Sequence, residues 1–95
     1  MGFSVKFNWV LQIDTPESLS CGAVFPFQKQ GNRIFPVDTP IDLIDPDRNA
    51  IARIKITSFT NSLDATTGYF SVMKLYSGNE KAVLTRYWIE IEASN

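Results

Sequence analysis

The chain has 95 residues, of which 44% are apolar, and its nine basic and ten acidic residues leave a formal net charge of −1. This composition excludes a disordered chain and suits one modest hydrophobic core. The near-neutral balance gives no electrostatic reason to expect nucleic acid or an anionic membrane as a partner.

The scarcity of histidine and cysteine excludes several kinds of catalytic and metal site. The chain has no histidine and one cysteine, Cys21. It therefore lacks Ser–His and Cys–His nucleophiles, histidine metal sites and an internal disulfide. No apolar run is long enough to cross a membrane, and the N-terminus lacks a signal-peptide pattern. We expect a cytoplasmic protein without enzymatic activity, cofactor or membrane attachment.

The first predicted strand covers residues 3–14. Apolar residues occupy every second position, which is the period of a strand with one buried and one wet face. These residues are Phe3, Val5, Phe7, Trp9, Leu11 and Ile13.

A hairpin is predicted next, with strands at 23–29 and 33–37 around Gly31 and Asn32. Glycine supplies the positive φ that a two-residue hairpin turn requires. Pro26 and Pro36 cannot donate to a ladder, so these strands are expected at a sheet edge.

Four further segments complete the predicted sheet. A short apolar run at 41–44 leads through a tight turn at 45–49 into a strand at 50–60. Strands at 67–76 and 81–92 follow, joined by a hairpin turn at 77–80. The buried face of 50–60 is expected to carry Ala50, Ala52, Ile54 and Ile56, and that of 81–92 to carry Val83, Tyr87, Ile89 and Ile91.

These patterns predict an all-β fold. We expect residues 1–95 to form a single domain, a small six- to seven-stranded, mostly antiparallel and partly closed barrel. At most a short helical turn is expected, at 15–21 or 61–66. An open sandwich has the same strand signals and remains the alternative.

An acidic segment is the first candidate site. Asp45, Asp47 and Asn49 match the opening of a calcium loop, but Ala50 and Ile56 stand where that loop requires glycine and glutamate. We favour a turn whose aspartates accept backbone N–H groups. Asp45 and Asp47 remain weak metal candidates, and a metal-dependent hydrolase would use them together with Asp42.

Aromatic and basic side chains offer two candidate surfaces. A protein-interaction surface would use Phe25, Phe27, Phe35 and Trp88. The alternative for each ring is a place in the core. An RNA- or nucleotide-binding face would use Arg53, Lys55, Arg86 and Trp88. The alternative for these cations is cross-strand ion pairing.

Three stretches carry a resemblance to known proteins: FPVDTPIDLIDPDRNAIARIKI, TTGYFSVMKLYSG and EKAVLTRYWIE. Together they resemble a family of small uncharacterised proteins from Gram-positive, spore-forming bacteria. The resemblance covers nearly the whole chain and implies no activity and no catalytic residues. The layout, with a turn leading into AIARIKI and then into aromatic strands, is also similar to small RNA-associated barrels of the PUA and ASCH kind, although architecture alone does not give function.

The leading functional interpretation is a non-catalytic binding or protein-interaction module, with a protein partner or a homodimer. RNA or nucleotide binding is the first alternative, which the net charge disfavours. The metal-dependent carboxylate hydrolase is the second.

Overall fold

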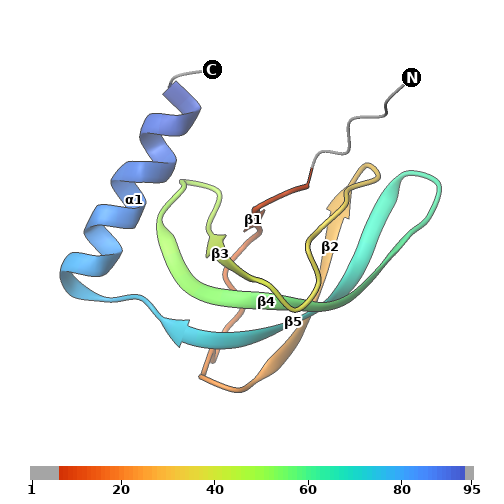
Figure 1. Cartoon of the computed structure of the whole chain (residues 1–95), viewed down its shortest axis with the longest axis horizontal. Coiled ribbons are helices and arrows are strands. Elements are labelled where there is room, and N and C mark those ends of the chain that lie inside the picture. The colour runs from red at the N-terminus through yellow and green to blue at the C-terminus, as the bar shows by residue number, and fades with distance from the viewer. Residues whose placement is uncertain (1–6, 94–95) are drawn as a thin grey trace.

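The computed structural model describes residues 7–93, which form one curled, mostly antiparallel sheet and one helix (Figure 1). The sheet curls into a half-barrel, which agrees with the expected partly closed architecture. The fold is mostly β rather than all-β, because it includes a 16-residue helix where at most a short helical turn was expected. The described residues form five strands rather than six or seven. The elements are β1 (Val10–Gln12), β2 (Val24–Gln30), β3 (Pro40–Ile44), β4 (Ala50–Asn61), β5 (Ala65–Leu75) and α1 (Gly78–Ala93).

The strand order places β1 and β2 at the two edges of the sheet. The order is β1-β3-β4-β5-β2, with antiparallel pairing everywhere except between β1 and β3. The two longest strands, β4 and β5, form the centre. Because the sheet curls, its two edges both border the open side of the half-barrel.

The core lies on the inner face of the sheet. Along β4 every second residue from Ala50 to Ile56 is buried, while Arg53 and Thr57 are exposed, which confirms the predicted alternation. Phe70 of β5 is fully buried at the centre. Its ring lies 5.8 Å from that of Phe25, centroid to centroid.

Gly68 allows β2, β4 and β5 to approach one another closely. A Cβ atom at this position would lie 2.3 Å from the Ser58 carbonyl oxygen and 2.9 Å from the Phe27 ring. Only glycine fits so near to a backbone atom. The ring of Phe27 packs in the space that a side chain would need.

The first strand is shorter than predicted. Only three residues pair as β1. The expected burial holds for Leu11 and in part for Ile13, which packs against the core, but not for Phe7 and Trp9. Phe7 and Trp9 are 44% and 56% exposed, because the sheet does not extend to cover them. Phe3 and Val5 lie outside the described residues.

The predicted hairpin between 23–29 and 33–37 is wrong. The partner of β2 is β5 along its whole length, with Phe27 opposite Gly68. Residues 33–37 form no strand of the sheet. Instead the Phe35 ring enters the core at 5.4 Å from that of Phe27, so burial of this ring determines the path of the segment.

The predicted last strand, 81–92, lies within the helix α1, and residues 78–80 of the predicted hairpin turn are the start of that helix. The apolar residues of this segment fit both the two-residue period of a strand and the longer period of a helix. Alternation favours a strand, whereas Leu84, Trp88 and Ile91 recur at helical spacing and are half-buried. Ser77 and Glu80 also have the spacing of a capping box, a helix-start signal.

Candidate ligand groove between the sheet edges

Every second residue of β2 directs its backbone N–H and C=O groups toward the outer edge of the sheet. Hydrogen bonds just beyond both ends of β2 show which of its residues bond to β5. The Val72 N–H donates to the Ala23 oxygen at 2.9 Å, and the Gly31 N–H donates to the Asp64 oxygen at 2.6 Å. Bonding residues alternate along an antiparallel strand. The odd-numbered residues of β2 therefore face β5, and the even-numbered ones direct their backbone groups outward. Pro26 is one of these, so the edge lacks one donor.

The same argument identifies the backbone groups of β1 that point away from the sheet. The Ile13 N–H donates to the Ile44 oxygen of β3 at 3.1 Å. Every second residue of a parallel strand bonds to its neighbour. Leu11 and Ile13 therefore face β3, and Val10 and Gln12 direct their N–H and C=O groups away from the sheet.

A hollow of about 600 Å³ lies between these two edges. We call it the edge groove. The Lys29 ammonium crosses it and donates to the main-chain oxygen of Gln12 at 2.5 Å. The Arg33 Nε donates to the main-chain oxygen of Gln30 at 3.0 Å. The polar residues that line the groove are Gln12, Asp14, Gln28, Lys29, Gln30 and Arg33.

The two cations of the edge groove have backbone carbonyls as their partners. Within residues 7–93 neither forms an ion pair, in contrast to Lys74, whose ammonium lies 2.9 Å from a Glu80 carboxylate oxygen. Burial lowers the pKa of Lys29, and the nearby charge of Arg33 lowers it further. Two like charges are thus held together in an open hollow, an arrangement that an anion would stabilise.

Exposed apolar side chains adjoin the groove at the start of β1. The Asn8 N–H donates to the Ile34 oxygen at 2.7 Å, which brings these two segments together. Ile34 is 41% exposed, and Phe7 and Trp9, the chain neighbours of Asn8, have their ring centroids 6.0 Å apart. We call Phe7, Trp9 and Ile34 the aromatic rim; they precede β1 or follow Arg33 in the chain, near residues that line the edge groove.

The aromatic residues predicted as an interaction surface lie in or near the core. Phe27 and Phe35 are 6% and 2% exposed, and Phe25 is half-buried against the core cluster. The structure therefore favours the core interpretation for these rings. Trp88 is half-buried on α1, with its ring 5.0 Å from that of Tyr87.

A polar network joins α1 to the sheet. The carboxylate of Asp42 accepts hydrogen bonds from the Tyr76 hydroxyl at 2.5 Å and from the Trp88 indole N–H at 2.8 Å. The Arg53 Nε donates to the same hydroxyl at 3.3 Å. Burial, together with the Asp42 hydrogen bond, raises the pKa of Tyr76 to about 12. Asp42 therefore links the helix to β3 and β5.

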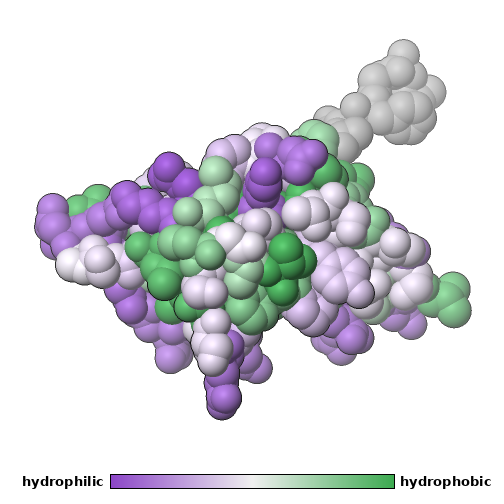
Figure 2. Space-filling view, turned by 90° about the horizontal axis from the view of Figure 1, so that it is seen from below, coloured by the Kyte–Doolittle hydropathy of each residue, from purple (hydrophilic) through white to green (hydrophobic). Residues whose placement is uncertain are grey.

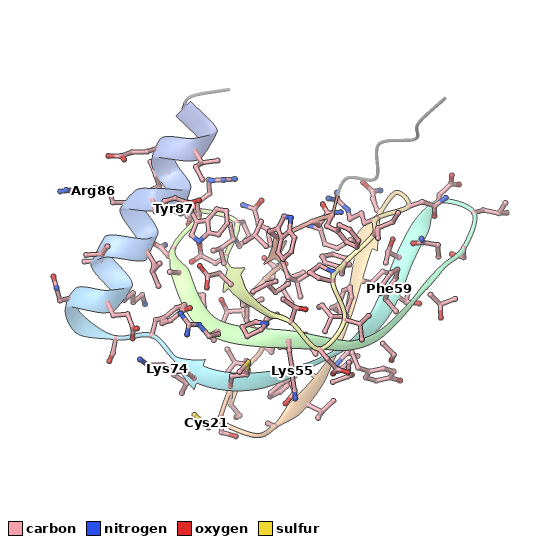
Figure 3. The ribbon with its side chains drawn as sticks, in the orientation of Figure 1. Cys21, Lys55, Phe59, Lys74, Arg86 and Tyr87 are labelled. Atoms are coloured by element: carbon pink, nitrogen blue, oxygen red, sulfur yellow. The ribbon has the colours of Figure 1, made fainter. Side chains whose placement is uncertain are left out.

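The residues of the predicted nucleic-acid face divide into two groups. Arg53 and Trp88 both belong to the network around Asp42. Arg86 points away from the sheet on the outer side of α1, and Lys55 lies near the middle of β4 (Figure 3). These four side chains do not line one groove.

The acidic segment forms a turn. The carboxylate of Asp45 accepts the Asn49 N–H at 2.8 Å and the Asn49 side-chain amide at 3.0 Å, as the turn interpretation predicts. Partial burial works to raise the pKa of Asp45, but these hydrogen bonds outweigh it and lower the pKa overall. In the part of the chain that the structure describes, no three acidic or cysteine side chains gather to hold a metal ion.

Other exposed apolar residues are dispersed. The outer face of β2 and β5 carries Val24, Tyr69 and Met73, and α1 carries Val83 and Ile89. Figure 2 shows that hydrophobic groups on the sheet face seen from below are interrupted by hydrophilic ones. Across residues 7–93 no helix is long and apolar enough to span a membrane.

Comparisons with known proteins identify a similar fold. No family model and no curated protein matches the chain. The crystal structure of protein ytmB from Bacillus subtilis is similar, with a TM-score of 0.65 and 22% sequence identity over 83% of this chain and 99% of that chain. At this identity the likeness shows the fold alone. It agrees with the predicted resemblance to small bacterial proteins, whereas spore-forming sources and PUA or ASCH barrels stay predictions.

The three residues that define the edge groove were missed by the sequence analysis. Lys29, Arg33 and Gln12 lie in different segments, and only the parallel pairing of β1 with β3 brings the two edges to one opening. No local motif signals such an arrangement. The one available clue was Pro26, which correctly marked β2 as an edge.

Proposed function

We propose that the chain is a non-catalytic binding module that takes an anionic ligand in the edge groove. The observation that carries this proposal is the pair of cations, Lys29 and Arg33, which face an open hollow without a carboxylate partner among the described residues. An anionic ligand would gain charge-assisted hydrogen bonds there, which are stronger than neutral ones.

The remaining groove residues suit binding rather than catalysis. Gln12, Gln28 and Gln30 offer amide donors and acceptors, and Asp14 is the one carboxylate that lines the groove. General acid–base catalysis needs a group with a pKa near the working pH, and the chain has no histidine. These features support a site that holds its ligand unchanged.

A titration tests this function. We expect hexaglutamate, added at low ionic strength, to give saturable shifts of the Lys29 and Arg33 backbone amide resonances in nitrogen-15 NMR spectra. Replacing either cation by methionine should weaken binding about tenfold, since each removes one charge-assisted contact. Lys55→Met, near the middle of β4, is the matched control and should bind as the wild type does.

Two outcomes count against the proposal. One is the absence of saturable shifts at millimolar hexaglutamate. The other is equal binding by the wild type and the Lys29→Met/Arg33→Met double variant. A uridine hexanucleotide serves as the comparison ligand, and weaker binding of it by Lys55→Met alone would instead favour the RNA alternative.

A further inference from the structure

We infer that the ligand of the edge groove is an extended, acidic polypeptide segment that pairs with the free edge of β1. This inference rests on the proposed function and specifies its ligand. It joins three observations that a compact anion would leave unexplained: the outward backbone groups of β1, the Lys29 bridge and the aromatic rim.

The edge of β1 offers the hydrogen bonds that a further strand requires. Val10 and Gln12 direct their N–H and C=O groups away from β3, as the bond from Ile13 to Ile44 shows, and Gln12 lines the groove. The edge ends at Asn8, whose N–H already donates to the Ile34 oxygen. Addition of a strand to an exposed edge is a recurrent mode of peptide recognition, in which main-chain bonds give affinity and side-chain contacts give specificity. The other edge is less suited, since Pro26 lacks a donor and Arg33 already binds the Gln30 oxygen.

Lys29 links strand addition to charge recognition. Its ammonium now donates to the Gln12 oxygen, the same acceptor that an added strand would use. When the strand takes this oxygen, the ammonium is released beside Arg33 and needs a new acceptor. A glutamate or aspartate side chain of the ligand supplies it, so the exchange leaves no cation without a partner.

The rim favours a polypeptide over a small anion. Phe7 and Trp9 lie within three residues before Val10, and both rings are exposed. Exposed apolar groups of this kind mark interaction sites when polar residues surround them. A segment along β1 would bring its own apolar side chains onto these rings while its acidic residue reaches the cations.

The experiment uses the whole chain and a short strand-forming probe, acetyl-Thr-Val-Glu-Val-Thr-amide. Three comparison ligands accompany it: the same peptide with glutamine for glutamate, the same peptide with both valine nitrogens methylated, and citrate. Affinity is measured by NMR titration, and amide hydrogen exchange is measured for Val10 and Gln12.

We expect the parent peptide to bind more tightly than all three comparison ligands and to slow exchange of the Val10 and Gln12 amides about tenfold. The glutamine peptide should lose about tenfold in affinity, and Lys29→Met should abolish that difference. The methylated peptide should bind weakly, because its backbone cannot pair.

The measurements distinguish failure of the strand inference from failure of the anion site. Binding without slower exchange at β1, or equal binding of the methylated peptide or citrate, overturns the strand inference while the anion site stands. Failure of the peptides, citrate and hexaglutamate alike overturns both.

Discussion

Asp42 is the residue on which the attachment of the helix depends. It accepts hydrogen bonds from Tyr76 and Trp88, which come from the segment after β5 and from α1. A partly buried carboxylate is stabilised by such donors and is costly to leave without them. The sequence analysis considered Asp42 as a hydrolase residue, because spacing alone cannot show which donors surround a carboxylate.

Tyr76→Phe tests this role. We expect the variant to lose about 2 kcal/mol of unfolding free energy, since the hydrogen bond to the charged Asp42 and the longer one from Arg53 both disappear without a change of shape. Urea denaturation at neutral pH measures the loss. Tyr69→Phe, at a ring that is 53% exposed, is the control and should change stability little.

The same substitution has a predictable pH dependence. The folded pKa of Tyr76 is raised to about 12, above the ordinary value near 10. The neutral phenol is therefore stabilised by folding, so its contribution is complete below pH 10 and is lost as the pH rises through 12. The stability difference between wild type and Tyr76→Phe should shrink across this window. A constant difference would show that the hydroxyl is not coupled to folding.

At the scale of elements, α1 shows how much of the fold the sequence can predict. The alternation of apolar and polar residues was sufficient to predict β4 as a strand, because one face of that strand meets the core and the other does not. The segment from Val83 to Ile91 satisfies both periods, and its contact with β4 decides in favour of the helix. Such a choice depends on a distant strand, which a local pattern cannot reveal.

A side-chain hydroxyl makes one of the contacts between α1 and β4. The Ala50 N–H donates to the Thr85 hydroxyl oxygen at 2.9 Å, and Ala50 is fully buried. Thr85→Val keeps the shape but removes the acceptor, so it should cost about 1–3 kcal/mol, the penalty for a buried donor without a partner. Denaturant unfolding measures this, with Thr60→Val at an exposed position of β4 as control. An unchanged midpoint for Thr85→Val would mean that water or another group replaces the hydroxyl.

At the scale of the whole molecule, the sheet forms a half-barrel that does not close. Its partly closed form was predicted from composition and turn spacing, because a small domain gains by removing sheet edges. The location of the opening was not predictable, since it depends on β1 pairing in parallel with β3 rather than on any feature of β1 itself. The candidate site follows from that topology: the opening collects Lys29, Arg33 and the free backbone of β1 in one groove.

The most direct test of this account is the set of intermolecular nuclear Overhauser effects between the acidic strand-forming peptide and the isotope-labelled chain. If the edge groove binds an acidic strand, contacts should run from the peptide backbone to Val10 and Gln12 at strand spacing, and from its glutamate to Lys29. Contacts that fall instead on Val83 and Ile89 of α1, or on the outer face of β5, would contradict it and place the binding surface elsewhere.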